Sequence, residues 1–249
     1  MERKRLTAKK AGIAEIVTGR FVQRSGFESN YVITKLGRRL SRVRALGLVV
    51  DKFVSEDGNY ATLTLDDGSE TIRCKTFVNT RIFDGINPGD LVDVIGKVRE
   101  YKDEIYVLPE TIKKADANLE TLRMLELKRQ GDEQRKKIKI VLDLKNQTAD
   151  LNELKAIAQK SGVSNEEAEA ILEAQELIEV EMEKKAEEST GVKEKLLKLI
   201  DEMDSGEGVD YMELLSKSGL AENVVDSAIQ ELLESGTCFE PRAGKIKRI

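Results

Sequence analysis

The feature that most constrains this chain is a series of five strand-length segments between residues 38 and 115. Each segment is alternating or mostly apolar, and Gly or Asp residues separate it from the next, which is typical of antiparallel strands joined by tight turns. Asp57-Gly58 and Asp67-Gly68 supply two of these turns, since Asp-Gly favours hairpins. The predicted strands cover residues 43–54, 60–65, 71–78, 91–101 and 105–112.

The third and fourth predicted strands are separated by a longer connection. Residues 79–87 are too polar for a strand and fit a short helix or loop, and Pro88-Gly89-Asp90 then ends the connection. Three strands, a short helical connection and two more strands is the order of the OB fold, a five-stranded, partly open barrel. We therefore predict an OB-type β-barrel over residues 38–115.

The pattern becomes helical after this barrel. Leu119, Leu122 and Leu125 recur at helical spacing before a polar break at residues 130–132. Three further helical runs then lead to residues 183–191, which are typical of a solvated linker. Residues 192–249 predict three helices and a two-stranded hairpin, which make a winged helix.

The chain is therefore expected to be multidomain, which also fits its 249 residues. The predicted parts are a basic N-terminal extension at 1–37, the barrel at 38–115, a helical region with an assembly helix and linker at 116–188, and a winged-helix domain at 189–249.

Charge is distributed unevenly along these parts. Residues 1–115 carry 21 Lys and Arg against 16 Asp and Glu, whereas the remainder carries 20 against 30. The basic segment 3–44 also contains Phe21, Phe27 and Tyr31, and its apolar run at 13–22 predicts packing rather than a free tail. We expect a polyanion to be bound at the N-terminal end.

The sequence offers little for catalysis or for a metal site. It contains no His and no GxxxxGK phosphate loop, and Cys74 and Cys238 lie far apart in apolar segments that favour burial. Nor does any apolar run approach the roughly 20 residues that span a bilayer. We expect a cytoplasmic, nucleoid-associated protein that is not an enzyme and needs no cofactor.

The outer face of the second and third strands is the candidate binding surface. Alternation directs Ala61, Leu63 and Leu65 inward and leaves Tyr60 outside. Rings with cations between them suit single-stranded nucleic acid, because bases stack on rings and phosphates attract positive charge. Alternatively, Tyr60 and Phe77 are a hydrophobic cross-strand pair packed under the N-terminal extension, and the basic residues form a solvated face. The candidate site residues are Arg42, Arg44, Lys52, Tyr60, Arg73, Lys75, Phe77, Tyr101, Lys102 and Tyr106.

The helical half favours protein partners. The third helix of the predicted winged helix, residues 222–234, is acidic and has no Lys or Arg, so DNA phosphates would repel it. The leucines at 119, 122 and 125 either cover the barrel core or join a helix bundle with other subunits, and we favour assembly. The hairpin cations fit either nucleic acid or an acidic peptide, and they are Arg242, Lys245, Lys247 and Arg248.

The order of these parts resembles the middle subunit of replication protein A, especially its archaeal versions. The segments that carry the resemblance are LGLVVDKF at 46–53, YATLTLDDGSETIRCK at 60–75 and CFEPRAGKIKRI at 238–249. It implies that the barrel binds single-stranded DNA, that the following helix joins other subunits, and that the winged helix recruits proteins of replication, repair and recombination. Residues 138–185 depart from the simplest version of that plan.

Two other functions fit the same sequence. In the first, the chain is an adaptor or scaffold whose partners supply the nucleic-acid contacts, so that neutralising Arg73 and Lys75 leaves nucleic-acid affinity unchanged. In the second, the barrel binds RNA, as other OB barrels do, and ribose strands are preferred over deoxyribose strands.

Overall fold

The computed structural model of the chain describes residues 6–26, 28–77, 79–148 and 150–249, without the side chain at 185. Phe27 and Val78, which the sequence places in the basic extension and in the third strand, lie outside the described residues, as do residues 1–5. The chain divides into two compact units, Met1–Leu177 and Ile178–Ile249. The finer division at residues 37, 115 and 188 stays a prediction.

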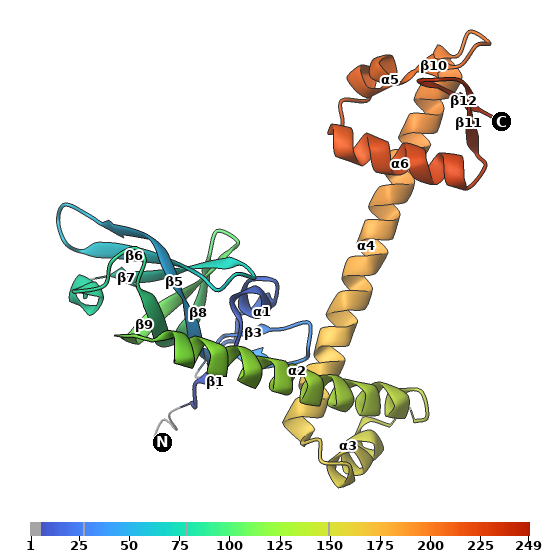
Figure 1. The fold of residues 1–249 in the computed structure, drawn as a ribbon. Coiled ribbons are helices and arrows are strands. Elements are labelled where there is room, and N and C mark those ends of the chain that lie inside the picture. The colour runs from blue at the N-terminus through green and yellow to red at the C-terminus, as the bar shows by residue number, and fades with distance from the viewer. Residues whose placement is uncertain (1–5, 27, 78, 149) are drawn as a thin grey trace. The chain divides into compact units, whose positions relative to one another are not determined.

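Five long strands close into a barrel in the first unit (Figure 1). Their order in the sheet is β5-β6-β7-β9-β8, and β8 pairs back with β5. The pairing of β7 with β9 is parallel and the other four pairings are antiparallel. This arrangement confirms the predicted OB barrel. Its elements are β5 (Arg42–Val54), β6 (Tyr60–Asp66), β7 (Thr71–Phe77), the short helix η1 (Thr80–Phe83), β8 (Leu91–Tyr101) and β9 (Glu104–Lys114).

The barrel core follows the predicted alternation. Ala61, Leu63 and Leu65 of β6 are fully buried, and Cys74 of β7 lies beside them. Gly96 stands at a register shift between β8 and β9, where a Cβ atom would come within 2.5 Å of the carbonyl oxygen of Leu108. A larger residue there would separate the strands, so the glycine allows the barrel to close.

The N-terminal extension is part of the barrel unit. Its apolar run forms α1 (Ile13–Val17), whose Ile13 and Ile16 are fully buried in the barrel core, and this confirms the predicted packing. β1 (Lys9–Lys10) adds a parallel edge to β5. The other two strands of the extension, β2 (Arg20–Val22) and β3 (Tyr31–Ile33), form a separate three-stranded sheet with β4 (Arg39–Leu40), which follows the extension.

α2 (Ala117–Lys145) follows the barrel as one continuous helix (Figure 1). The predicted break at residues 130–132 is wrong. Gly131 costs about 1 kcal/mol relative to Ala in a helix, but strong helix formers flank it and Arg129 pairs with Glu133 one turn apart at 2.9 Å. The helix propensity and the ion pair of the surrounding residues therefore outweigh the cost of Gly131.

A small helical core fills the end of the first unit. It is built from the last turns of α2, from α3 (Leu151–Lys160) and from the start of α4 (Asn165–Met203). Ala170 and Ala174 of α4 also pack against Tyr31 and Ile33 of β3. Residues 183–191, predicted to be a linker, are mostly exposed but belong to α4.

The second unit is a winged helix, as predicted. The end of α4 packs with two shorter helices and a three-stranded sheet of order β10-β12-β11 around Leu196, Leu214 and Ile246. The sequence had predicted the hairpin but not its third strand. The elements are β10 (Val209–Asp210), α5 (Tyr211–Ser218), α6 (Glu222–Glu234), β11 (Cys238–Arg242) and β12 (Lys245–Arg248).

Candidate nucleic-acid interface

The hairpin of β6 and β7 places its outward side chains in a regular array. Tyr60 stands opposite Phe77 in the ladder, and their ring centroids are 5.3 Å apart. Phe53 of β5 extends the row, with its ring centroid 6.3 Å from that of Tyr60. The side chains of Phe53 and Phe77 are 53% and 52% exposed. Three neighbouring rings are thus presented on the face where OB barrels usually hold a strand.

Phe53 is a site residue that the sequence analysis missed. A register shift between Val49 and Asp51 interrupts the alternation of β5, so counting by twos from the start of the strand misplaces the residues after it. The sequence did carry a signal, because Phe53 lies near the end of its predicted strand, shortly before the Asp57-Gly58 turn. An aromatic residue at the end of a strand near a loop of the binding face is a candidate contact.

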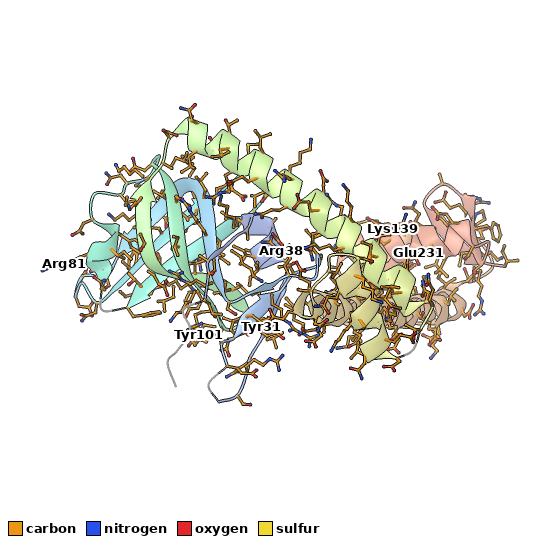
Figure 2. The ribbon with its side chains drawn as sticks, turned by 90° about the horizontal axis from the view of Figure 1, so that it is seen from below. Tyr31, Arg38, Arg81, Tyr101, Lys139 and Glu231 are labelled. Atoms are coloured by element: carbon orange, nitrogen blue, oxygen red, sulfur yellow. The ribbon has the colours of Figure 1, made fainter. Side chains whose placement is uncertain are left out.

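An open cleft of about 490 Å³ adjoins this row of rings. Glu104 lies in it together with six of the ten residues that the sequence proposed. Figure 2 shows Tyr101 at the rim of the barrel. The residues lining the cleft are Tyr60, Lys75, Phe77, Tyr101, Lys102, Glu104 and Tyr106.

The tight turn between β8 and β9 forms one side of the cleft. Lys102 and Asp103 both adopt left-handed backbone conformations, with φ of 51° and 61°. Two such residues give the hairpin turn whose twist matches that of the flanking strands, at some cost for residues other than glycine. The Lys102 ammonium lies 5.5 Å from the centroid of the Tyr101 ring, so the turn presents a ring and a cation together.

The two cations of β7 are not free, contrary to the expected pairing of rings with available positive charge. Lys75 donates to Oε2 of Glu104 at 2.6 Å, and Arg73 donates to Oε1 of the same carboxylate at 3.2 Å. The Lys75 side chain is only 10% exposed, and its ammonium lies 4.9 Å from the Tyr106 ring centroid. The outer face of β7 therefore carries an ion triad and not two unpaired cations.

The first strand does not bring its cations into the cleft. Lys52 donates to the carbonyl oxygens of Phe83 and Ile86, at 2.9 and 2.8 Å, and so ties β5 to the end of η1 and to the connection after it. Arg42 pairs with Glu110 at 2.7 Å, and Arg44 pairs with Asp93. None of the three lines the cleft, because each points to a partner elsewhere on the barrel.

The leucines of α2 do not cover the barrel core. Leu122 and Leu125 are 50% and 62% exposed, Met124 beside them is exposed, and Leu119 is half-buried. Near these leucines the buried side chain of the helix is polar, since Arg123 donates to the carbonyl oxygen of Arg44 at 3.1 Å. Of the two roles that the sequence allows for these leucines, contact with other subunits is therefore the one that stays as a prediction.

The winged helix presents a different surface. All four cations of its hairpin pair with acidic residues of the same unit. Arg242 and Lys245 lie 3.4 and 3.6 Å from the Glu207 carboxylate, Lys247 lies 3.7 Å from Asp204, and Arg248 lies 2.6 Å from Asp201. The acidic helix α6 adds no Lys or Arg, so neither the hairpin nor α6 presents an unpaired cation to phosphate.

The described residues contain no group of three or more His, Cys, Asp or Glu that could hold a metal ion. Both cysteines are buried, as predicted, and burial raises the pKa of the Cys74 thiol to about 12. Among the described helices, none has the length and hydropathy needed to cross a bilayer.

Two solved structures of low sequence identity are similar to the chain. One is a replication protein A heterotrimer bound to single-stranded DNA, with 14% identity and a TM-score of 0.44 over 52% of this chain and 98% of that chain. The other is the S. pombe Stn1–Ten1 complex, with 17% identity and a TM-score of 0.43 over 51% of this chain and 93% of that chain.

Sequence comparison identifies the family. Residues 42–115, which span β5 to β9, match the family described as OB-fold nucleic acid binding domain. The uncharacterized protein MJ1654 of Methanocaldococcus jannaschii is 31% identical over 215 residues, which cover 85% of this chain and 76% of that protein. The chain therefore belongs to the same family as this M. jannaschii protein, and its barrel is an OB-fold nucleic acid binding domain.

Proposed function

We propose that this chain is a single-stranded DNA-binding subunit of an assembly like replication protein A, acting in replication, repair and recombination. The observation that carries the proposal is the cleft lined by four aromatic rings on the binding face of the barrel. Stacking a base on such a ring contributes roughly 1–3 kcal/mol and tolerates any sequence. A duplex keeps its bases stacked inside, so exposed rings favour single strands.

The row formed by Phe53, Tyr60 and Phe77 supports binding of more than one base. Adjacent ring centroids are separated by 6.3 and 5.3 Å, so each ring has its own face or edge to offer. Tyr101 adds a further exposed ring at the turn between β8 and β9. The strand would then run across β6 and β7 and be held by that turn.

The exposed side of α2 supports the second part of the proposal, which is assembly with other subunits. Leu122 and Leu125, three residues apart, expose apolar side chains on one surface of a helix that Arg123 already fixes to the barrel. Apolar side chains gathered on one helix surface favour burial against another helix. The partners would be further subunits of the assembly.

The winged helix would recruit proteins and not DNA. Its third helix repels phosphate, and the cations of its hairpin are neutralised within the unit. Met212 and Phe239 are exposed on the same unit and offer apolar anchors of the kind that protein interfaces use.

Fluorescence-anisotropy titration of labelled oligo-dT tests the DNA-binding proposal, with duplex DNA and RNA of equal length measured beside it at low and moderate salt. We expect preference for the DNA single strand, and a loss of about tenfold or more in Tyr60→Ala and Phe77→Ala, which each remove a stacking ring. Phe239→Ala removes a similarly exposed ring from the second unit and should leave the affinity unchanged.

The outcome also separates the alternatives. Equal losses in Phe239→Ala would contradict a site in the cleft, and tighter binding of RNA would favour the RNA-binding function. No binding of any strand at low salt would overturn direct recognition by the chain and favour the adaptor function, in which the exposed leucines of α2 contact the subunits that hold the strand.

A further inference from the structure

Glu104 occupies an unusual position for a carboxylate in a site for a polyanion. It is the first residue of β9, and it lines the cleft beside Tyr101 and Tyr106. Its two oxygens accept hydrogen bonds from different cations, Oε1 from Arg73 and Oε2 from Lys75. These are the two cations of β7, so one side chain engages both.

The triad is stable at neutral pH. Burial raises the pKa of Glu104, but the hydrogen bonds and positive charges of Lys75 and Arg73 outweigh this effect and bring the pKa below its ordinary value of 4.5. The carboxylate therefore remains ionised. A phosphate would have to displace it from Lys75, whose side chain is largely buried between Glu104 and the Tyr106 ring.

We propose that Glu104 is a specificity-determining residue that keeps backbone phosphates off Arg73 and Lys75, so that, apart from Lys102 at its edge, the cleft recognises bases and not polyanionic charge. The inference rests on the proposed function, from which it takes single-stranded DNA as the ligand of the cleft. Its physical basis is competition, because a carboxylate held within the protein is present at a higher local concentration than any phosphate of a flexible strand.

Binding of a single strand through phosphate contacts has a characteristic salt dependence. Each contact releases counterions and adds a slope of about −0.7 to the plot of log affinity against log salt. Stacking on rings adds no such slope. The native cleft should consequently bind oligo-dT with a shallow salt dependence and should bind a base-free strand poorly.

Glu104→Gln tests the inference, with Glu110→Gln as its matched control. Glu110 lies on the same strand and also pairs with two cations, Arg42 at 2.7 Å and Lys97 at 3.8 Å, but it lies outside the cleft. Both substitutions remove one negative charge and free two cations. The probes are oligo-dT and an abasic DNA strand of equal length, titrated by fluorescence anisotropy over a range of salt concentrations.

We expect the salt slope on oligo-dT to steepen in Glu104→Gln, by about 0.7 if one freed cation contacts a phosphate and about 1.4 if both do. Affinity for the abasic strand should rise by roughly three- to tenfold, the scale of one or two exposed ion pairs. Glu110→Gln should change both quantities much less. Equal changes in the two variants, or an unchanged slope in Glu104→Gln, would overturn the inference.

The proposed function can fail separately. If oligo-dT binds no better than the abasic strand in the native protein, the cleft does not recognise bases and the proposed function is contradicted, whatever the variants do. Thermal unfolding of each variant verifies folding. If Glu104→Gln does not fold, Glu104→Asp keeps the charge but shortens the reach to the two cations, and it should shift the slope in the same direction by a smaller amount.

Discussion

The barrel unit and the winged-helix unit carry similar residues at their surfaces but arrange them differently. On the barrel, Phe53, Phe77 and Tyr101 are exposed together beside a cleft. On the winged helix, Met212 and Phe239 are exposed, and Glu207 alone neutralises two of the hairpin cations. The grouping of exposed rings beside a cleft distinguishes the two surfaces, whereas ion pairing within the unit engages cations on both.

This difference shows what local charge can and cannot indicate. The N-terminal part is basic in sequence, yet five of the six cations of the predicted site are engaged by acids or carbonyl groups of the barrel, and the sixth, Lys102, lies beside the Tyr101 ring. Exposed ion pairs contribute little stability, so their main effect is on which charges are available to a ligand. Ring exposure is therefore a better guide to the binding surface of this protein.

The largest expected effect tests whether the two units are energetically separate. Leu63→Ala in the barrel and Leu214→Ala in the winged helix each remove a fully buried side chain, which costs about 2–5 kcal/mol. Hydrogen exchange followed by mass spectrometry should show faster exchange mainly in the unit that carries the substitution. Destabilisation of both units by either variant would mean that they unfold together.

A second comparison concerns exposed side chains of the two units. Tyr101→Ala should weaken binding of oligo-dT by the stacking contribution of one ring, roughly 1–3 kcal/mol, and should barely change the melting temperature because the ring is exposed. Met212→Ala on the winged helix is the control and should leave affinity unchanged. The same loss in both variants, measured by anisotropy, would remove the distinction between the two surfaces.

Helix caps should behave alike in the two units, since their chemistry is local. The Asp210 carboxylate accepts from the backbone N–H of Met212 at 2.9 Å at the start of α5, and Asp116 accepts from that of Leu119 at 2.8 Å at the start of α2. Asp→Ala at either position should cost about 1 kcal/mol, measured by denaturant titration. A much larger cost at Asp116 would show that the start of α2 supports the barrel as well.

The smallest effect is expected from the hairpin of the winged helix. Glu207→Gln releases Arg242 and Lys245 from their shared partner. If this unit binds proteins and not nucleic acid, affinity for oligo-dT should change by less than about twofold, because the pairs are exposed and worth little. A larger gain in the anisotropy titration would instead indicate that the hairpin stands near the bound strand.

Much of the fold could be predicted from local patterns. Alternation identified the inward side chains of β6, and turn residues located the hairpins between strands, because both signals act over a few residues. The same local reasoning failed at Gly131, where neighbouring turns maintain the helix, and at Phe53, where a bulge changes the alternation of β5.

The sequence by itself determined the class of each part: an OB-type barrel, a helical region and a winged helix with an acidic third helix. It also determined which face of β6 is buried. Only the tertiary structure decided which charges are available, because Glu104 is distant in sequence from Arg73 and Lys75 and reaches them only through the parallel pairing of β7 with β9. Ion pairing depends on separations of a few ångströms between side chains, and barrel closure sets those separations.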